Sequence, residues 1–266
     1  MTISRMATHF FPVRAVSPRR VRAAYKSAKR GFSLAGAGFE PPELGAELRL
    51  LTVLFVDMQG YTELVRTISP AQLHGYLNRF LSAMTQIVVA SQGTPDKYIG
   101  DAVMAYWGAP LSDANQANHA VAAALEMTHV AARLDAEFQQ QRLPPLRIRI
   151  GINTGVAQWC ELGSGRFRSR TVIGDPVNLA YRFQTVAKQA RAVIAAGAAT
   201  VQAAGAYRFR SLGNFPIGSR SAELELFEPI GQAGKLRHLD LPFFVSHHLD
   251  SAHQTWPPAG RFKLAF

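Results

Sequence analysis

Two aspartates stand where apolar segments of the chain end. Asp57 follows the mainly apolar run 50–56, and Asp101 follows Gly100 between two short apolar runs. A strand end and a tight turn can bring two carboxylates to one edge of a sheet, and Mg²⁺ prefers one or two carboxylates together with phosphate and water oxygens. An aspartate in either place is also typical of a turn or a cap, so these two residues alone leave both interpretations open.

Asn178 and Arg182 form a second candidate pair. They are four residues apart in a segment that is expected to be helical from 177 to about 188, so both side chains should share one face. That spacing can present an amide and a guanidinium together to a ligand. An Asn helix cap beside a surface arginine is the alternative interpretation.

The elements that would position these residues follow from apolar periodicity and from turn residues. We expect a strand at 50–56, a helix that begins at Ser69 and Pro70 and is broken by Gly93, a strand on each side of Gly100 and Asp101 within 97–107, a helix from Asp113 to about Gln140, and a strand at 146–152. The order β, α, β, β, α, β predicts an α+β fold with a ferredoxin-like βαββαβ core, in which two helices cover one face of an antiparallel sheet.

A C-terminal β/α extension should follow this core. Its expected parts are a polar, arginine-bearing loop at 163–165, the helix at 177–188, and short strands at 192–195, 207–212 and 223–227. We therefore divide the chain into a basic N-terminal arm (1–47), a folded domain (48–232) and a C-terminal tail (233–266), and we expect both ends to be disordered.

Composition narrows the class of protein. The chain has 266 residues, of which 48% are hydrophobic and 18% are charged, as in ordinary globular proteins. The net charge of +11 is concentrated in residues 1–40, which hold eight Lys and Arg residues against Glu40, but no nucleic-acid recognition motif accompanies them. The single cysteine, Cys160, excludes an intramolecular disulfide, and no apolar run is long enough to span a membrane, so we expect a cytoplasmic location.

Four segments, in this order, resemble class III adenylyl/guanylyl cyclase catalytic domains of the bacterial adenylyl type. They are FVDMQGYT at 55–62, DKYIGDAVMAYWGAP at 96–110, GINTG at 151–155 and TVIGDPVNLAYR at 171–182. The resemblance covers about residues 48–230.

The resemblance implies an adenylate cyclase, a lyase that converts ATP to 3′,5′-cyclic AMP and pyrophosphate by in-line attack of the ribose 3′-hydroxyl on the α-phosphorus. Asp57 and Asp101, with the Met58 carbonyl, would hold two Mg²⁺ or Mn²⁺ ions per site. Asn178 would orient the ribose, and Arg182 would neutralise charge that develops on the α-phosphate.

Base selection in this family depends on two positions that correspond to Lys97 and Thr171. Lysine can donate to adenine N1, and threonine can serve the exocyclic amine. Arg220 stands where the family has a phosphate-contacting lysine, and a plain surface arginine is the alternative there. A guanylyl cyclase or a cyclase of relaxed specificity is the first alternative function.

The resemblance also implies a head-to-tail homodimer whose active sites lie between two subunits, and it leaves room for an upstream sensor domain. Five residues depart from the family pattern: Phe183 and Gln184 at packing positions, and Cys160, Glu161 and Arg170. The last three raise the second alternative, a catalytically silent regulatory domain that binds nucleotide or dimerises.

Overall fold

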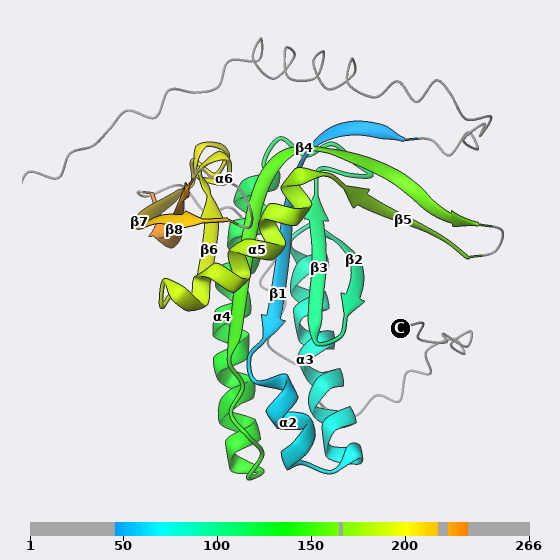
Figure 1. The fold of residues 1–266 in the computed structure, drawn as a ribbon, viewed down its shortest axis with the longest axis vertical. Helices are drawn as coiled ribbons and strands as arrows, with labels where there is room; N and C mark the ends of the chain where they lie inside the picture. Colours follow the sequence, from blue (N-terminus) through cyan, green and yellow to red (C-terminus); the bar gives the residue numbers. More distant parts are fainter. Residues whose placement is uncertain (1–45, 165–166, 218–222, 234–266) are drawn as a thin grey trace, which may run out of the picture. The chain divides into compact units, whose positions relative to one another are not determined.

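The computed structural model describes residues 46–164, 167–217 and 223–233. Along the chain these residues form β1 (Glu47–Met58), α2 (Tyr61–Thr67), α3 (Pro70–Ala90), β2 (Thr94–Ile99), β3 (Ala102–Trp107), α4 (Gln116–Gln140), β4 (Ile148–Ser164), β5 (Phe167–Ile173), α5 (Asp175–Gln189), β6 (Ile194–Gly197), α6 (Ala198–Ala203), β7 (Tyr207–Pro216) and β8 (Glu223–Gln232). Figure 1 shows how these elements are arranged around one sheet.

The sheet has eight strands in the order β2-β3-β1-β4-β6-β8-β7, and β5 pairs with β4 beside this path. Within the part β2-β3-β1-β4, every neighbouring pair is antiparallel. Together with α3 and α4, this part has the ferredoxin-like βαββαβ connectivity, so the predicted fold class is confirmed. The strand β6 extends the sheet by pairing parallel to β4.

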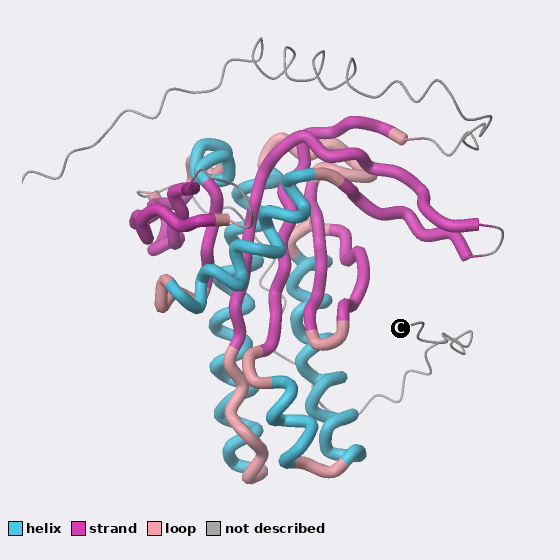
Figure 2. The backbone as a smooth tube through the Cα atoms, viewed as in Figure 1, coloured by secondary structure: helices cyan, strands magenta, loops and turns pink. Residues whose placement is uncertain are grey.

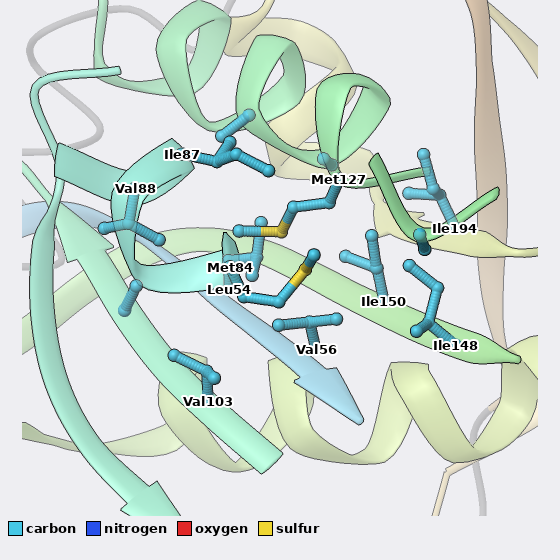
Figure 3. Packing of buried hydrophobic residues seen from close by; sticks show 14 of the residues in the cluster. Leu54, Val56, Met84, Ile87, Val88, Val103, Met127, Ile148, Ile150 and Ile194 are labelled. Carbon is cyan, nitrogen blue, oxygen red and sulfur yellow. The ribbon is translucent and has the colours of Figure 1, made fainter. Parts of the chain in front are cut away.

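Strand β1 is apolar on both faces because the sheet is covered on both faces. Leu54, Val56 and Met58 belong to the larger cluster of buried residues, which includes side chains of α3 and α4. Figure 3 shows Met84 and Met127 meeting Leu54, Val56 and Ile150 in this cluster. The alternate residues of β1, at 51, 53 and 55, pack in a second cluster together with Ala180 of α5.

Helix α5 lies directly on the sheet because two strand glycines allow close approach. A Cβ atom on Gly151 would lie 2.1 Å from the Ala180 carbonyl oxygen and 2.5 Å from the Gln184 nitrogen, both in the α5 backbone. A Cβ atom on Gly155 would lie 2.6 Å from Pro176 Cγ, at the start of the same helix. The two glycines of GINTG therefore set the position of the helix that carries Asn178 and Arg182.

The helix that covers the other face begins as its sequence predicts. Ser69 caps α3: its Oγ accepts a hydrogen bond from the Gln72 backbone amide at 3.3 Å, and Gln72 Oε1 accepts one from the Ser69 amide at 3.0 Å. Helix α4 instead begins at Gln116, three residues after the predicted start. The Asp113 carboxylate binds the Asn115 amide at 2.7 Å in the turn before the helix.

The largest difference from expectation concerns the predicted polar loop at 163–165. Gly163 and Ser164 instead end β4, whereas Gly165 lies outside the described residues. Strand β5 pairs antiparallel with this end of β4, from Gln158 opposite Ile173 to Ser164 opposite Phe167. Figure 2 shows the two strands running side by side. Interstrand backbone hydrogen bonds maintain this hairpin where its side chains are polar, so the polarity that indicated a loop reflects exposure.

The expectations for both chain ends fall almost entirely outside the described residues, as does Arg220. Strand β1 begins at Glu47 and strand β8 ends at Gln232, next to the two domain boundaries that the sequence predicts. In the part of the chain that the structure describes, no helix is long and apolar enough to cross a membrane.

Candidate active site

Strand pairing brings Asp57 and Asp101 to the same end of the sheet. Asp57 is the penultimate residue of β1, and Asp101 lies in the β2–β3 turn, where Gly100 adopts a φ of 63°. Because Val56 pairs with Val103, the end of β1 lies beside the residues that begin β3. Figure 1 shows the end of β1 and the β2–β3 turn at the same end of the sheet.

The electrostatics of this pair favour a cation. Burial, followed by the negative charge of Asp101, raises the pKa of Asp57 to about 6, although a hydrogen bond from the Met58 backbone opposes the shift. Burial also raises the pKa of Asp101. Two carboxyl groups that are partly desolvated and repel one another would be stabilised in the ionised form by a bound cation.

The donor set suits Mg²⁺ or Mn²⁺ held partly by a ligand. Among the described residues, no group of three or more His, Cys, Asp or Glu side chains could hold a metal ion. Two carboxylates and a backbone carbonyl such as that of Met58 leave coordination positions for phosphate and water oxygens, which is the arrangement that Mg²⁺ favours. The residues present therefore fit a metal that arrives with a phosphorylated substrate.

Arg149 is a cross-strand neighbour of Asp57 that the sequence interpretation missed. It is the partner of Asp57 in the β1–β4 register, so both side chains are on the same face. Burial lowers the pKa of Arg149, and the charge of Glu228 opposes this shift. Its Nε is buried and has no partner among the described residues. The alternation of Arg147 and Arg149 with isoleucines indicated only a strand, and the register with Asp57 needed the fold.

Lys97 and Thr171 meet at an open pocket of about 350 Å³. Lys97 Nζ donates a hydrogen bond to Thr171 Oγ1 at 2.9 Å, although 74 residues separate them. The pocket is also lined by Asn178 and by apolar side chains, namely Phe55, Ile99, Met104, Leu162, Val172, Ile173, Val177 and Tyr181. An apolar slot with a lysine and a hydroxyl at its edge has the chemistry expected of a site for a planar heterocycle.

Helix α5 places Asn178 and Arg182 differently. Asn178 lies in the first turn of the helix and lines the pocket. Arg182 does not line it, and its Nη1 donates a long hydrogen bond of 3.4 Å to the Ile217 carbonyl. This contact occupies one of the five donors of the guanidinium group.

Among the described residues of one chain, only one group of the predicted site residues lines the pocket. Lys97, Thr171 and Asn178 line the pocket, whereas Asp57 and Asp101 lie at the sheet end and do not line it. The pocket rim is apolar and exposed: Ile99, Leu162, Ile173 and Tyr181 are each between 40% and 49% accessible. An apolar rim of this kind is typical of a surface that another molecule covers.

Cys160, Glu161 and Arg170, three of the departures from the family pattern, lie outside the pocket lining. Cys160 is buried opposite Thr171, and burial raises the pKa of its thiol, so it is a neutral packing residue at neutral pH. Glu161 is the cross-strand partner of Arg170. The Arg170 guanidinium lies 5.2 Å from the Trp159 ring centroid, and Arg49 lies 5.1 Å from the same ring, as expected of cation–π contacts.

Comparison with known proteins agrees with this geometry. Residues 46–227 match the family model described as the adenylate and guanylate cyclase catalytic domain. Adenylate cyclase 1 of Rhizobium meliloti (strain 1021) is 34% identical over 185 residues, covering 68% of this chain and 27% of that protein. The adenylate cyclase of Anabaena cylindrica is 35% identical over 164 residues, covering 59% and 31%. The chain thus spans about a third or less of the length of these curated relatives.

Solved structures show the same fold. The adenylyl cyclase CyaB from P. aeruginosa has a TM-score of 0.67 and 29% identity, covering 73% of this chain and 100% of that chain. The guanylyl cyclase Cya2 has a TM-score of 0.65 and 27% identity, covering 73% and 98%. Because these structures include both adenylyl and guanylyl cyclases, the similarity does not determine which nucleotide this chain uses. The match over residues 46–227 does show the family, and the chain belongs to the class III adenylate and guanylate cyclase catalytic domains.

Proposed function

We propose that this domain is an adenylyl cyclase that converts ATP to 3′,5′-cyclic AMP and pyrophosphate at sites formed between two copies of the chain. The observation that carries the choice of ATP is the pair Lys97 and Thr171 at the edge of the apolar pocket. An ammonium group complements the adenine ring nitrogen N1, which accepts a hydrogen bond, and a hydroxyl oxygen complements the exocyclic amine.

The reaction joins the ribose 3′-oxygen to the α-phosphorus and breaks the bond from that phosphorus to the bridging oxygen of the β-phosphate. Bound Mg²⁺ or Mn²⁺ would lower the pKa of the 3′-hydroxyl and neutralise the triphosphate. Asp57, Asp101 and the Met58 carbonyl would hold the ions. Asn178 orients the ribose, and Arg182 turns from the Ile217 carbonyl to the α-phosphate.

The proposed dimer follows from the separation of the two groups of residues. One subunit supplies the pocket and the other supplies the aspartates, so a head-to-tail pair completes two identical sites. The exposed apolar residues at the pocket rim support this arrangement, because pairing would remove them from water. A phosphate contact from Arg220 is part of the same proposal.

The first test is cyclic AMP formation from ATP and Mn²⁺ over a range of protein concentrations. Specific activity should rise with concentration as the dimer assembles, and Asp57→Ala should lower turnover at least about 100-fold. Asp113→Ala is the matched control, because this carboxylate serves the turn before α4. Equal turnover of GTP would favour the guanylyl or relaxed alternative. A folded, dimeric protein without activity would favour the silent regulatory alternative.

Mixing two inactive variants tests the shared site directly. In a heterodimer of Asp57→Ala and Asn178→Ala, one site carries both substitutions and the other carries neither. If subunits exchange freely, an equimolar mixture should regain about a quarter of wild-type activity. A mixture that remains inactive while heterodimers form would place both residues in a site within one chain.

A further inference from the structure

Asp96 is a buried carboxylate directly behind the pair that lines the pocket. Its side chain is fully buried, and its Oδ2 accepts a hydrogen bond from Thr171 Oγ1 at 2.9 Å. The same oxygen lies 3.1 Å from Lys97 Nζ. Because Lys97 also donates to Thr171, the three polar groups contact one another in a closed triangle. Asp96 does not line the pocket, so it can act on a ligand only through its two partners.

A β-bulge makes this triangle possible. In the β2–β3 ladder Pro95 pairs with Ala105 and Lys97 pairs with Met104, so Asp96 is an extra residue between consecutive partners. Neighbouring side chains of a regular strand point to opposite faces, which would keep either Asp96 or Lys97 from reaching Thr171. A bulge redirects one side chain, and here both residues reach the same hydroxyl.

Stability gives no evident reason for a carboxylate at this place. The second oxygen of Asp96, Oδ1, is buried without a hydrogen-bond partner among the described residues. Burying a charged group with one oxygen unpartnered costs free energy, and a buried ion pair is weak support for stability in general. The position of Asp96 behind two pocket residues points instead to a role in ligand recognition.

The triangle determines where the Thr171 hydroxyl proton lies. An ionised carboxylate only accepts hydrogen bonds, and an ammonium group only donates them. The Thr171 hydroxyl proton therefore points to Asp96, and one lone pair of the hydroxyl oxygen accepts the hydrogen bond from Lys97. The remaining lone pair makes Thr171 a hydrogen-bond acceptor toward the pocket.

We propose that Asp96 is a positioning residue that selects adenine over guanine by fixing Thr171 as an acceptor. This inference rests on the proposed cyclase function and on the adenine pose that Lys97 and Thr171 define. The exocyclic amine of adenine donates to Thr171, whereas guanine places its O6, an acceptor, at that position. A polar group left without its partner in a recognition site is strongly disfavoured, so guanine is rejected.

The test is Asp96→Asn, which keeps the shape and changes the hydrogen-bond roles. Because Oδ2 contacts both partners, an amide nitrogen in its place would donate to Thr171 Oγ1 and would repel the Lys97 ammonium, which also only donates. The hydroxyl proton is then released to face the pocket and to donate to guanine O6. We expect the ratio of kcat/KM for ATP to that for GTP to fall about tenfold, mainly through a gain for GTP. The ratio of the two dissociation constants, measured by calorimetry with Ca²⁺ in place of Mn²⁺, should fall in parallel.

Two companion variants separate this role from a structural one. Thr171→Val removes the hydroxyl and should lower both ATP binding and ATP selectivity. In the Thr171→Val background, adding Asp96→Asn should change the ratio by much less than it does in wild type, because no hydroxyl remains to be reoriented and only the contact with Lys97 is altered. Asp135→Asn, the same change at a carboxylate on α4 that binds the Leu146 amide at 2.9 Å, should leave the ratio unchanged.

Each outcome distinguishes the inference from the proposed function. If wild type forms cyclic AMP selectively and folded Asp96→Asn keeps the same ratio, Asp96 does not set the choice of base. If Asp96→Asn does not fold, an unchanged ratio in Thr171→Val would overturn the inference. If wild type turns over neither nucleotide, the cyclase proposal fails. Binding can still be measured in that case, and equal dissociation constants for ATP and GTP would also overturn the proposed selection of adenine.

Discussion

The two faces of the central sheet are built on different principles. On the face covered by α3 and α4, large side chains fill the space, and most candidate site residues lie elsewhere. On the face covered by α5, the helix backbone rests on Gly151, and the pocket with Lys97 and Thr171 opens beside the helix. Side-chain volume thus determines the first face, whereas close backbone approach determines the second. We therefore expect substitutions on the α3–α4 face to lower stability and substitutions on the α5 face to lower activity.

Among residues outside the proposed catalytic and binding groups, the largest effect on activity is expected from Gly151→Ala. The new Cβ atom would lie 2.1 Å from a carbonyl oxygen of α5, so the helix must move away from the sheet. Because a shift of about 1 Å in a catalytic group can cost about 100-fold, turnover should fall by about that factor. Steady-state cyclase assays measure this loss, with circular dichroism to verify folding.

The control for that change is Gly75→Ala on α3, where a Cβ atom would meet nothing within 4 Å. Alanine in a helix should raise stability by about 0.5–1 kcal/mol there, with activity unchanged. Equal activity of the Gly151 and Gly75 variants would show that α5 does not need its direct contact with the sheet.

The opposite pattern is expected from Met84→Ala in the core of the α3–α4 face. Met84 is fully buried, so its truncation should lower the free energy of unfolding by about 2–5 kcal/mol. Turnover per folded molecule, assayed well below the melting temperature, should stay close to that of wild type. Val89→Ala, at a position that is 60% exposed on the same helix, should change stability by less than about 0.5 kcal/mol. A large loss of turnover in folded Met84→Ala would show that the two faces are coupled.

A smaller effect is expected on the melting temperature, where Asp57 and Asp135 should contribute to stability with opposite dependence on pH. The pKa of Asp57 is raised from 3.8 to about 6, so its contribution to stability is complete below pH 3.8 and is lost as the pH rises through 6. Without divalent cations, Asp57→Asn should therefore raise the melting temperature at pH 7 by no more than about 2–4 °C, because solvent screens this half-buried group. The difference should vanish near pH 4.

Asp135 on α4 should behave in the opposite way. Although burial alone would raise its pKa, hydrogen bonds from Gln139, Arg147 and Leu146 hold it below the ordinary value. Its contribution is present above that ordinary value and is lost as the pH falls through the lowered pKa. Asp135→Asn should thus lower the melting temperature at pH 7. Thermal unfolding of both variants between pH 4 and 8 measures the two signs, and equal signs would contradict this assignment.

The sequence predicts the α3–α4 face well because helical spacing and the Ser69 cap are local signals. It also predicts the βαββαβ order and Asp101 in its turn. It does not predict the β4–β5 hairpin, because Gly163 and Ser164 have the composition of a loop while they continue a ladder. The shift of the α4 start is similar, since Asp113 caps a turn rather than the helix.

The site is also predicted only in part, because some of its residues are placed by strand pairing rather than by local sequence signals. The resemblance identifies Lys97 and Thr171, and the structure brings them within 2.9 Å. Asp96 and Arg149 were missed because their roles depend on register: one is an extra residue in a ladder, and the other lies opposite Asp57. Neither a bulge nor a cross-strand partner has a periodic signature within its own segment.

The stack at Trp159 gives the domain a built-in optical reporter. Arg49 of β1 and Arg170 of β5 both lie against this indole of β4, so the ring contacts both neighbouring strands. Its Nε1 also donates a hydrogen bond to the Tyr106 hydroxyl at 3.2 Å. Indole emission is sensitive to nearby charge, and a movement of the β4–β5 hairpin would displace a guanidinium from the ring. Trp107 and Trp256 also emit, so the part of a nucleotide-dependent emission change that Trp159→Phe removes would report, without any label, a movement of the strand that carries Thr171.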